Sequence, residues 1–413
     1  MKLRTITKIG NGKIEHIIIL TGVMTNMRIT KCCLIMFFLF LLSGCWDKKE
    51  LNEVAVVMGV GIDKVDKEYK ITAQVIKPPT GEQAGGGGSE LPTWSVSATG
   101  RTVLGAIRNL NELSPRRLYF AHLQVIIFGD ELAREGIAPA IAWFERDRDS
   151  RAGALLVVTK GTAEDLLNQK IELGNVSSKS MSELIERSTI RQISAMEIKL
   201  RDLMTILSTP GIEPVLDVIN PKEIRGKVET FELDGVAIFN KDKLKGYVYG
   251  SDATGTEIIN SKLNFSIIEG KCPKQEEEYF AFQITDFLSK VKPELKGERI
   301  TLKVNVTLEG NLLDQTCPLD LLKTEYLHAV EKEIAMNIKN SVENEFQVAK
   351  NLGSDIYGVG REVRRFYPEY WKEIRGSSDY LNRVDFDIKV KSNLRRSGLI
   401  IDPTEVKVKE ETD

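Results

Sequence analysis

Hydrophobic and polar positions divide the chain into a short apolar run near the N-terminus and a long body in which the two kinds alternate. In the first half of the body, short apolar segments typical of strands are separated by segments with apolar residues every three or four positions, as in helices. The strands expected here are residues 54–62, 69–76, 94–98, 123–128 and 155–159, and the helices are residues 102–113, 130–144 and 162–167. The first two strands enclose a charged turn and predict a hairpin. Residues 78–92, with four successive glycines, predict a loop.

The second half of the body begins with strands and continues with helices. The expected strands are residues 231–239, 245–249, 263–268, 279–285, 300–308 and 384–390, and the expected helices are residues 319–352 and 359–375. The longer helix has one apolar stripe, formed by Leu327, Val330, Ile334, Ile338, Val342 and Phe346. This spacing favours a helix that packs on a sheet, with a partner-binding helix as the alternative.

Prolines at positions 210, 214 and 221 punctuate the chain between the two halves. We therefore expect a domain boundary at about residues 220–226, which gives an N-terminal part at 45–225 and a C-terminal part at 226–413. Strands and helices that are partly alternating and partly segregated predict the α+β class, in a multidomain body of two to three domains.

The short apolar run, residues 32–42, predicts an export signal. It is well below the roughly 20 residues that a bilayer-spanning helix requires. Arg28 and Lys31 precede it, and small residues follow it. Positive charge, a short apolar core and small residues at the exit are typical of a secretory signal peptide, so we assign residues 1–44 to the signal region. A short buried helix is the alternative.

The four residues at the end of this run, Leu42-Ser43-Gly44-Cys45, match the bacterial lipobox. The thiol of Cys45 would take up diacylglycerol, the small Ser43 and Gly44 would admit the peptidase, and Leu42 would fill its apolar subsite. A lipid on Cys45 would hold the body on the outer face of a membrane. The polar residues before Met27 do not fit this signal, so we expect translation to start at Met27 or at Met24.

Composition narrows the function classes. The chain has 413 residues, a formal net charge of −2, 28% charged and 42% apolar residues. The mixed charges argue against a nucleic-acid binder, which would have a basic face. Two cysteines follow Cys45 in the sequence, Cys272 and Cys317, and each precedes a proline. We expect two unpaired thiols at the edges of elements, with a disulfide as the alternative.

Catalytic and cofactor motifs are missing from the sequence. The three histidines, His16, His122 and His328, have no zinc-type spacing to one another or to cysteines. Gly59-Val60-Gly61 precedes a charged hairpin turn instead of a helix, so it is not a dinucleotide fingerprint, and there is no P-loop and no Gly-x-Ser-x-Gly elbow. We therefore expect no catalytic residue, no metal and no cofactor.

Several segments along the chain resemble those of one known family. They are Cys45-Trp46-Asp47, Glu50-Leu51-Asn52-Glu53, Gly59-Val60-Gly61-Ile62-Asp63, Leu233-Asp234-Gly235-Val236-Ala237-Ile238-Phe239, Asp242-Lys243-Leu244-Lys245-Gly246, Asp355-Ile356-Tyr357-Gly358-Val359-Gly360, Tyr367-Pro368 and Trp371. In this order they resemble the Ger(x)C spore germination lipoproteins, the C subunits of nutrient germinant receptors. Among these we expect Gly235 and Gly246 to serve turns or close contacts, Tyr367 and Trp371 to lie in the core, and Asp355 to cap a helix or belong to an interaction loop.

The resemblance implies a three-domain mixed α/β body that assembles with two membrane-embedded subunits, A and B, at the spore inner membrane. It implies a lipidated Cys45 and a non-enzymatic role in the response to nutrients. Two other functions share the lipobox. A substrate-binding lipoprotein of an ABC importer would show two similar lobes, and a cell-wall enzyme would show a catalytic constellation; the sequence shows neither.

Overall fold

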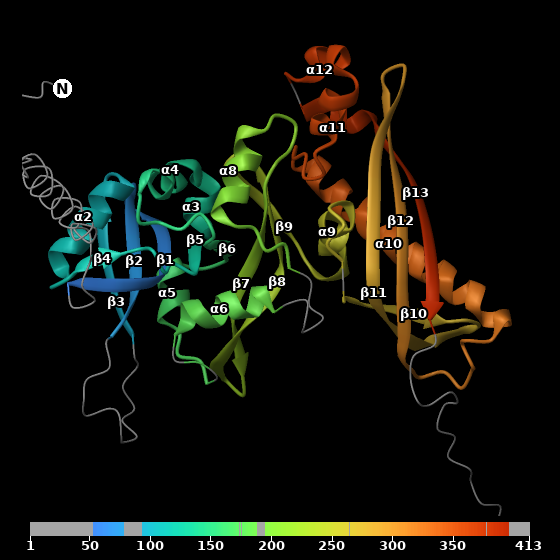
Figure 1. The fold of residues 1–413 in the computed structure, drawn as a ribbon, viewed down its shortest axis with the longest axis horizontal. Helices are drawn as coiled ribbons and strands as arrows, with labels where there is room; N and C mark the ends of the chain where they lie inside the picture. The colour runs from blue at the N-terminus through green and yellow to red at the C-terminus, as the bar shows by residue number, and fades with distance from the viewer. Residues whose placement is uncertain are drawn as a thin grey trace, which may run out of the picture. The chain divides into compact units, whose positions relative to one another are not determined.

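The computed structural model describes residues 53–77, 93–187 apart from 173 and 175, 195–376 apart from 264, and 378–395. The signal region, the lipobox and the glycine-rich loop at 78–92 lie outside these residues. The described chain is α+β, as the sequence predicts, and is built on two β-sheets (Figure 1).

The first sheet has nine strands in the described chain, in the order β3-β2-β1-β5-β6-β7-β8-β9, with β4 beside β1. The four central strands β1, β5, β6 and β7 run parallel, and the outer strands pair antiparallel. The strands are β1 (Val54–Val65), β2 (Glu68–Ile76), β3 (Thr93–Gly100), β4 (Arg117–Tyr119), β5 (Val125–Gly129), β6 (Leu155–Thr159), β7 (Val215–Ile224), β8 (Lys227–Asn240) and β9 (Lys243–Val248). The hairpin predicted from the first two strands is confirmed as β1–β2.

Helices cover both faces of the first sheet, which is why its central strands β5 and β6 are buried along their whole length. In β5, Ile126 and Phe128 belong to one core cluster, whereas Val125 and Ile127 belong to the other. The first cluster includes residues of α2 (Val103–Leu113), α3 (Asp130–Glu135) and α4 (Ala138–Arg146). The second includes residues of α5 (Ala163–Asn168) and α6 (Ser177–Glu186), on the opposite face in Figure 1.

The second sheet carries the long helix. Its strands are β10 (Ile267–Cys272), β11 (Gln275–Lys296), β12 (Arg299–Gln315) and β13 (Val384–Arg395), in that order. Helix α10 (Thr324–Asn351) packs on this sheet through the predicted stripe, in which Val330, Ile334, Ile338, Val342 and Phe346 are buried. The prediction of a helix packed on a sheet is thus confirmed.

Two predicted helices are each divided in two. The segment 130–144 is divided at Gly136, which adopts a φ of 137° and separates α3 from α4. The segment 359–375 is divided before Pro368, which starts α12 (Pro368–Ile374) after α11 (Val359–Phe366). Proline cannot donate the backbone hydrogen bond that would continue the first helix.

The predicted domain boundary falls in a tight turn. β7 and β8 form an antiparallel hairpin, and the turn residues Arg225 and Gly226 both have positive φ. β8 and β9 therefore belong to the first sheet, and the chain leaves that sheet only after Val248.

Cys272 and Cys317 form a disulfide, so the expectation of two unpaired thiols was wrong. Their Cα atoms are 6.4 Å apart although 45 positions separate them in the sequence. Cys272 ends β10, and Cys317 follows β12. The antiparallel order β10-β11-β12 brings these two ends together, and the prediction that both cysteines lie at element edges is confirmed.

Candidate functional site

The lipobox residues Leu42, Ser43, Gly44 and Cys45 lie outside the part of the chain that the structure describes, so lipidation of Cys45 stays a prediction. The first residue of β1, Val54, pairs with Arg117 of β4. Nine positions separate Cys45 from Val54. A chain of this length spans at most about 30 Å when fully extended.

The Gly-x-Gly-x-Asp segment of β1 is a packing and capping element. A Cβ atom at Gly59 would lie 2.4 Å from the Ser178 Cβ of α6, and one at Gly61 would lie 3.0 Å from the Ala163 Cβ of α5. The buried carboxylate of Asp63 accepts hydrogen bonds from the backbone N–H of Ala163 at 2.7 Å and of Glu164 at 3.0 Å. Both glycines thus allow two helices to approach β1, and Asp63 holds the start of α5.

Asp217 on β7 is a second buried carboxylate that binds two successive backbone donors. It accepts hydrogen bonds from the N–H of Met196 at 2.7 Å and of Glu197 at 3.0 Å. Burial raises the pKa of Asp217 to about 6, against the lowering effect of these two donors. The segment before α8 (Leu200–Ser208) is thereby fixed to the centre of the first sheet.

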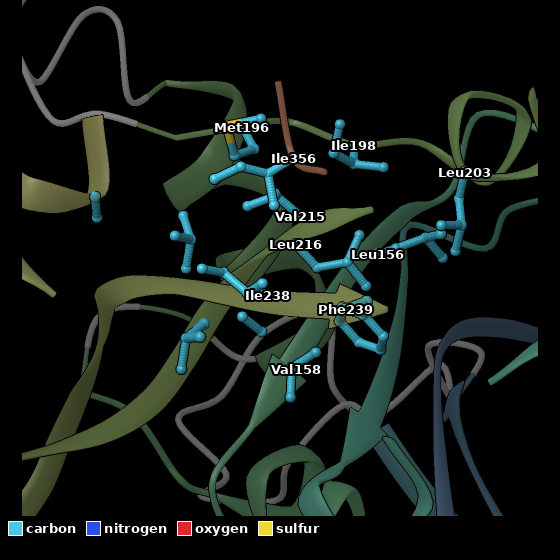
Figure 2. Close-up of a cluster of buried hydrophobic side chains, with 14 of the residues drawn as sticks. Leu156, Val158, Met196, Ile198, Leu203, Val215, Leu216, Ile238, Phe239 and Ile356 are labelled. Carbon is cyan, nitrogen blue, oxygen red and sulfur yellow. The ribbon is translucent and has the colours of Figure 1, made fainter. Parts of the chain in front are cut away.

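A candidate site is a hollow of about 730 Å³ at the contact between the first sheet and the segments around α11 and α12. Its walls are joined by two backbone hydrogen bonds. The N–H of Glu213 donates to the carbonyl oxygen of Asp355 at 2.9 Å, and the N–H of Arg361 donates to that of Gly211 at 2.7 Å. The apolar cluster beside it is continuous, because Ile356 lies among side chains of β6, β7 and β8 (Figure 2).

Asp355 organises this hollow. Its carboxylate accepts hydrogen bonds from the backbone N–H of Val359 at 2.8 Å, from that of Gly360 at 2.7 Å and from the Tyr380 hydroxyl at 2.7 Å. Burial raises the pKa of Asp355 to about 6, although these donors lower it. The prediction that Asp355 caps the helix after it, α11, is confirmed.

Glu213 is the second carboxyl group of the hollow. Burial raises its pKa to about 7, helped by the nearby charge of Asp355 and opposed by a hydrogen bond from the backbone N–H of Lys241. The described residues that line the hollow include neither histidine nor cysteine. Both carboxyl groups accept hydrogen bonds from backbone N–H groups, so Asp355 fixes the start of α11 and Glu213 fixes the turn between β8 and β9, one on each side of the hollow.

Another buried carboxyl group, that of Glu345, joins α10 to the short helix α9 (Gly255–Ile259). Glu345 accepts hydrogen bonds from the backbone N–H and, at 3.0 Å, the hydroxyl of Thr256, and from the Tyr357 hydroxyl at 3.1 Å. Burial raises the pKa of Glu345 to about 8.

Two histidines, His122 and His328, lie in the described chain. His122 meets the ring of Tyr119 edge to face, with centroids 6.2 Å apart. His328 is exposed on α10, with its Nδ1 3.2 Å from Glu331. Within the described ranges, no cluster of three or more His, Cys, Asp or Glu residues could hold a metal ion.

Four further predictions about motif residues are confirmed. Gly235 has a φ of 84°, and a Cβ there would lie 2.0 Å from the carbonyl oxygen of Val248. A Cβ at Gly246 would lie 2.9 Å from Leu352. Trp371 is buried, and Tyr367 is half-buried against the core.

The sequence did not indicate the roles of Asp217 and Glu345. Each binds a segment that is distant in the sequence, so no local pattern marks it. For Asp63 a signal existed, because it ends the Gly-x-Gly-x-Asp segment while Thr162 and Asp165 form a helix start.

Within the described ranges, no helix has the length and apolar character needed to cross a bilayer. The body is an α+β assembly built on two sheets, and this fold has a solved counterpart. The crystal structure of the GerBC protein matches with a TM-score of 0.54 and 16% identity, over 84% of this chain and 99% of that chain.

Two sequence-family models match this chain. The family model described as spore germination protein N-terminal domain matches residues 47–221. The model described as Spore germination B3/GerAC like, C-terminal, matches residues 234–398. The chain therefore belongs to the Ger(x)C family of spore germination proteins.

Curated relatives in Bacillus subtilis (strain 168) agree over nearly the whole length. Spore germination protein KC is 26% identical over an alignment of 413 positions, and this alignment covers 93% of this chain and 100% of that protein. Spore germination protein A3 is 26% identical over 381 residues, 90% of this chain and 98% of that protein. The resemblance seen in the sequence motifs is thus confirmed.

Proposed function

We propose that this protein is the lipid-anchored, non-enzymatic subunit of a spore nutrient germinant receptor. Cys45 would carry the lipid, and the body would lie on the outer face of the spore inner membrane. There it would assemble with two membrane-embedded subunits, A and B, and support the response to nutrients.

The observation that carries this proposal is the order of features along the chain. A lipobox ends at Cys45, and the N-terminal family match begins two residues later and is followed by the C-terminal match. The Cys272–Cys317 disulfide supports export, because disulfides form and persist in oxidising compartments. In the hollow beside α11, the carboxylate of Asp355 is bound as a helix cap, which supports a scaffolding role.

Replacing the anchor cysteine tests the proposal. In a strain that lacks paralogous receptors, we expect Cys45→Ala to remove the diacylglycerol mass, release the protein from the spore membrane fraction and abolish nutrient germination. Cys33→Ala is the matched control, since Cys33 lies in the signal region and would leave with it. Membrane retention and normal germination of the Cys45→Ala strain would contradict the proposal.

A further inference from the structure

A second hollow, of about 390 Å³, lies at the end of the first sheet where the described chain begins. Its apolar floor is formed by Ala55 on β1, Val75 and Ile76 on β2, Trp94 on β3 and Pro115 after α2. The strand register brings these residues together, because Val75 pairs with Trp94 in β3 and with Val57 in β1.

The rim of this hollow is cationic and has an exposed apolar side chain next to it. Lys77 and Arg116 line it, and Leu113, which is 57% exposed, lies two residues before Pro115. Arg117 also lies there, but its guanidinium group is 3.4 Å from Asp149, so it offers little charge to a partner. Glu53 is exposed at the start of the sheet, and its negative charge opposes the positive charges of the rim. The apolar side chains must therefore supply most of any contact.

A tryptophan in an apolar surface with basic residues at its edge suits the interface of a bilayer. Tryptophan favours the headgroup level, and each basic residue near an anionic surface strengthens binding about fivefold. Ten positions separate Ala55 from Cys45. If Cys45 carries a lipid, the hollow stays within about 35 Å of the headgroups, since a chain of ten residues reaches no further.

We propose that this surface, formed by Ile76, Lys77, Trp94, Leu113, Pro115 and Arg116 and called the docking surface, lies on anionic phospholipid headgroups with Trp94 at the interface. The proposal rests on the proposed lipid anchor. Docking would fix which end of the first sheet faces the membrane.

Quenching of Trp94 by brominated lipid tests the proposal on the full lipidated chain. The chain would carry Trp46→Phe, because Trp46 lies beside the anchor, and would be reconstituted in vesicles of phosphatidylglycerol and phosphatidylcholine with brominated acyl chains. We expect bromine to quench at least half of the Trp94 emission, obtained by subtracting the spectrum of the additional Trp94→Phe variant. Equal quenching with and without Trp94 would overturn the proposal.

Charge reversal provides an independent arm that leaves the core intact. We expect Lys77→Glu with Arg116→Glu to lower the quenching of Trp94 at least twofold. Lys389→Glu with Lys391→Glu, which reverses two exposed charges on β13, should leave it unchanged. Equal quenching in the two double variants would also overturn the proposal.

The mass of the Cys45 peptide separates a failed docking surface from a failed anchor. A lipidated, vesicle-bound chain without Trp94 quenching overturns the docking surface alone and leaves the anchor standing. A chain that carries no lipid on Cys45 and does not sediment with vesicles overturns both.

Discussion

Removing the Asp355 carboxylate should destabilise the body at the start of α11. Asp355→Ala leaves three buried donors without their acceptor: the N–H groups of Val359 and Gly360 and the Tyr380 hydroxyl. An unsatisfied buried donor costs about 1–3 kcal/mol. The variant also removes a carboxylate whose burial is unfavourable, since its pKa is raised to about 6. We therefore expect the free energy of unfolding to fall by about 3 kcal/mol, the lower end of the sum.

Urea unfolding of the mature chain measures this loss. The emission of Trp371 is a local probe, because its ring packs edge to face on Tyr380 with centroids 5.9 Å apart. Tyr380→Phe removes one of the three hydrogen bonds and should cost about 1 kcal/mol. Asp314→Ala, at an exposed position of β12, is the control and should stay within about 0.5 kcal/mol of wild type. An Asp355→Ala chain as stable as this control would refute the capping role.

Three further predictions concern other parts of the body. Replacing Cys272 and Cys317 by Ser should lower the free energy of unfolding by about 4 kcal/mol, the value expected for a disulfide closing a loop of 45 residues; equal urea midpoints with and without the disulfide would contradict it. Burial raises the pKa of Glu345 to about 8. Between about pH 4.5 and about pH 8 the folded state therefore binds a proton that the unfolded state has lost. Over this range the contribution of Glu345 to the free energy of unfolding falls by up to about 1.4 kcal/mol per pH unit as the pH rises. Glu345→Gln should flatten that part of the pH profile in urea titrations, and an unchanged slope would count against it. Gly59→Ala should cost about 1–3 kcal/mol in thermal unfolding, because its Cβ would overlap that of Ser178; an unchanged midpoint would contradict the close approach.

Local patterns predicted the elements that depend on local spacing. The stripe of α10 and the alternation of β12, where Ile300, Leu302, Val304, Val306 and Leu308 are buried, follow from the periods of helix and strand. These elements were assigned correctly because one face of each meets a core. The sequence motifs also gave the family, since they keep their order along the chain.

Features that depend on distant pairing could not be predicted. The charged residues and Pro293 in the second half of β11 favour the end of a strand. The strand nevertheless continues to Lys296, because it pairs with β12 along this length. The disulfide follows from the same pairing of β10, β11 and β12. The carboxylate of Asp217 binds a segment about 20 positions away that no local pattern links to it.

The central claim, that this chain is an anchored receptor subunit, is tested most directly by what it assembles with. The tagged protein would be captured from detergent-solubilised spore membranes, and the co-purifying chains would be identified by mass spectrometry, with the Cys45→Ala strain as the control. We expect two multi-spanning receptor subunits to co-purify with the wild-type chain. Recovery of an ATPase and a permease would contradict the claim and identify an importer, and recovery of no specific chain would contradict receptor assembly.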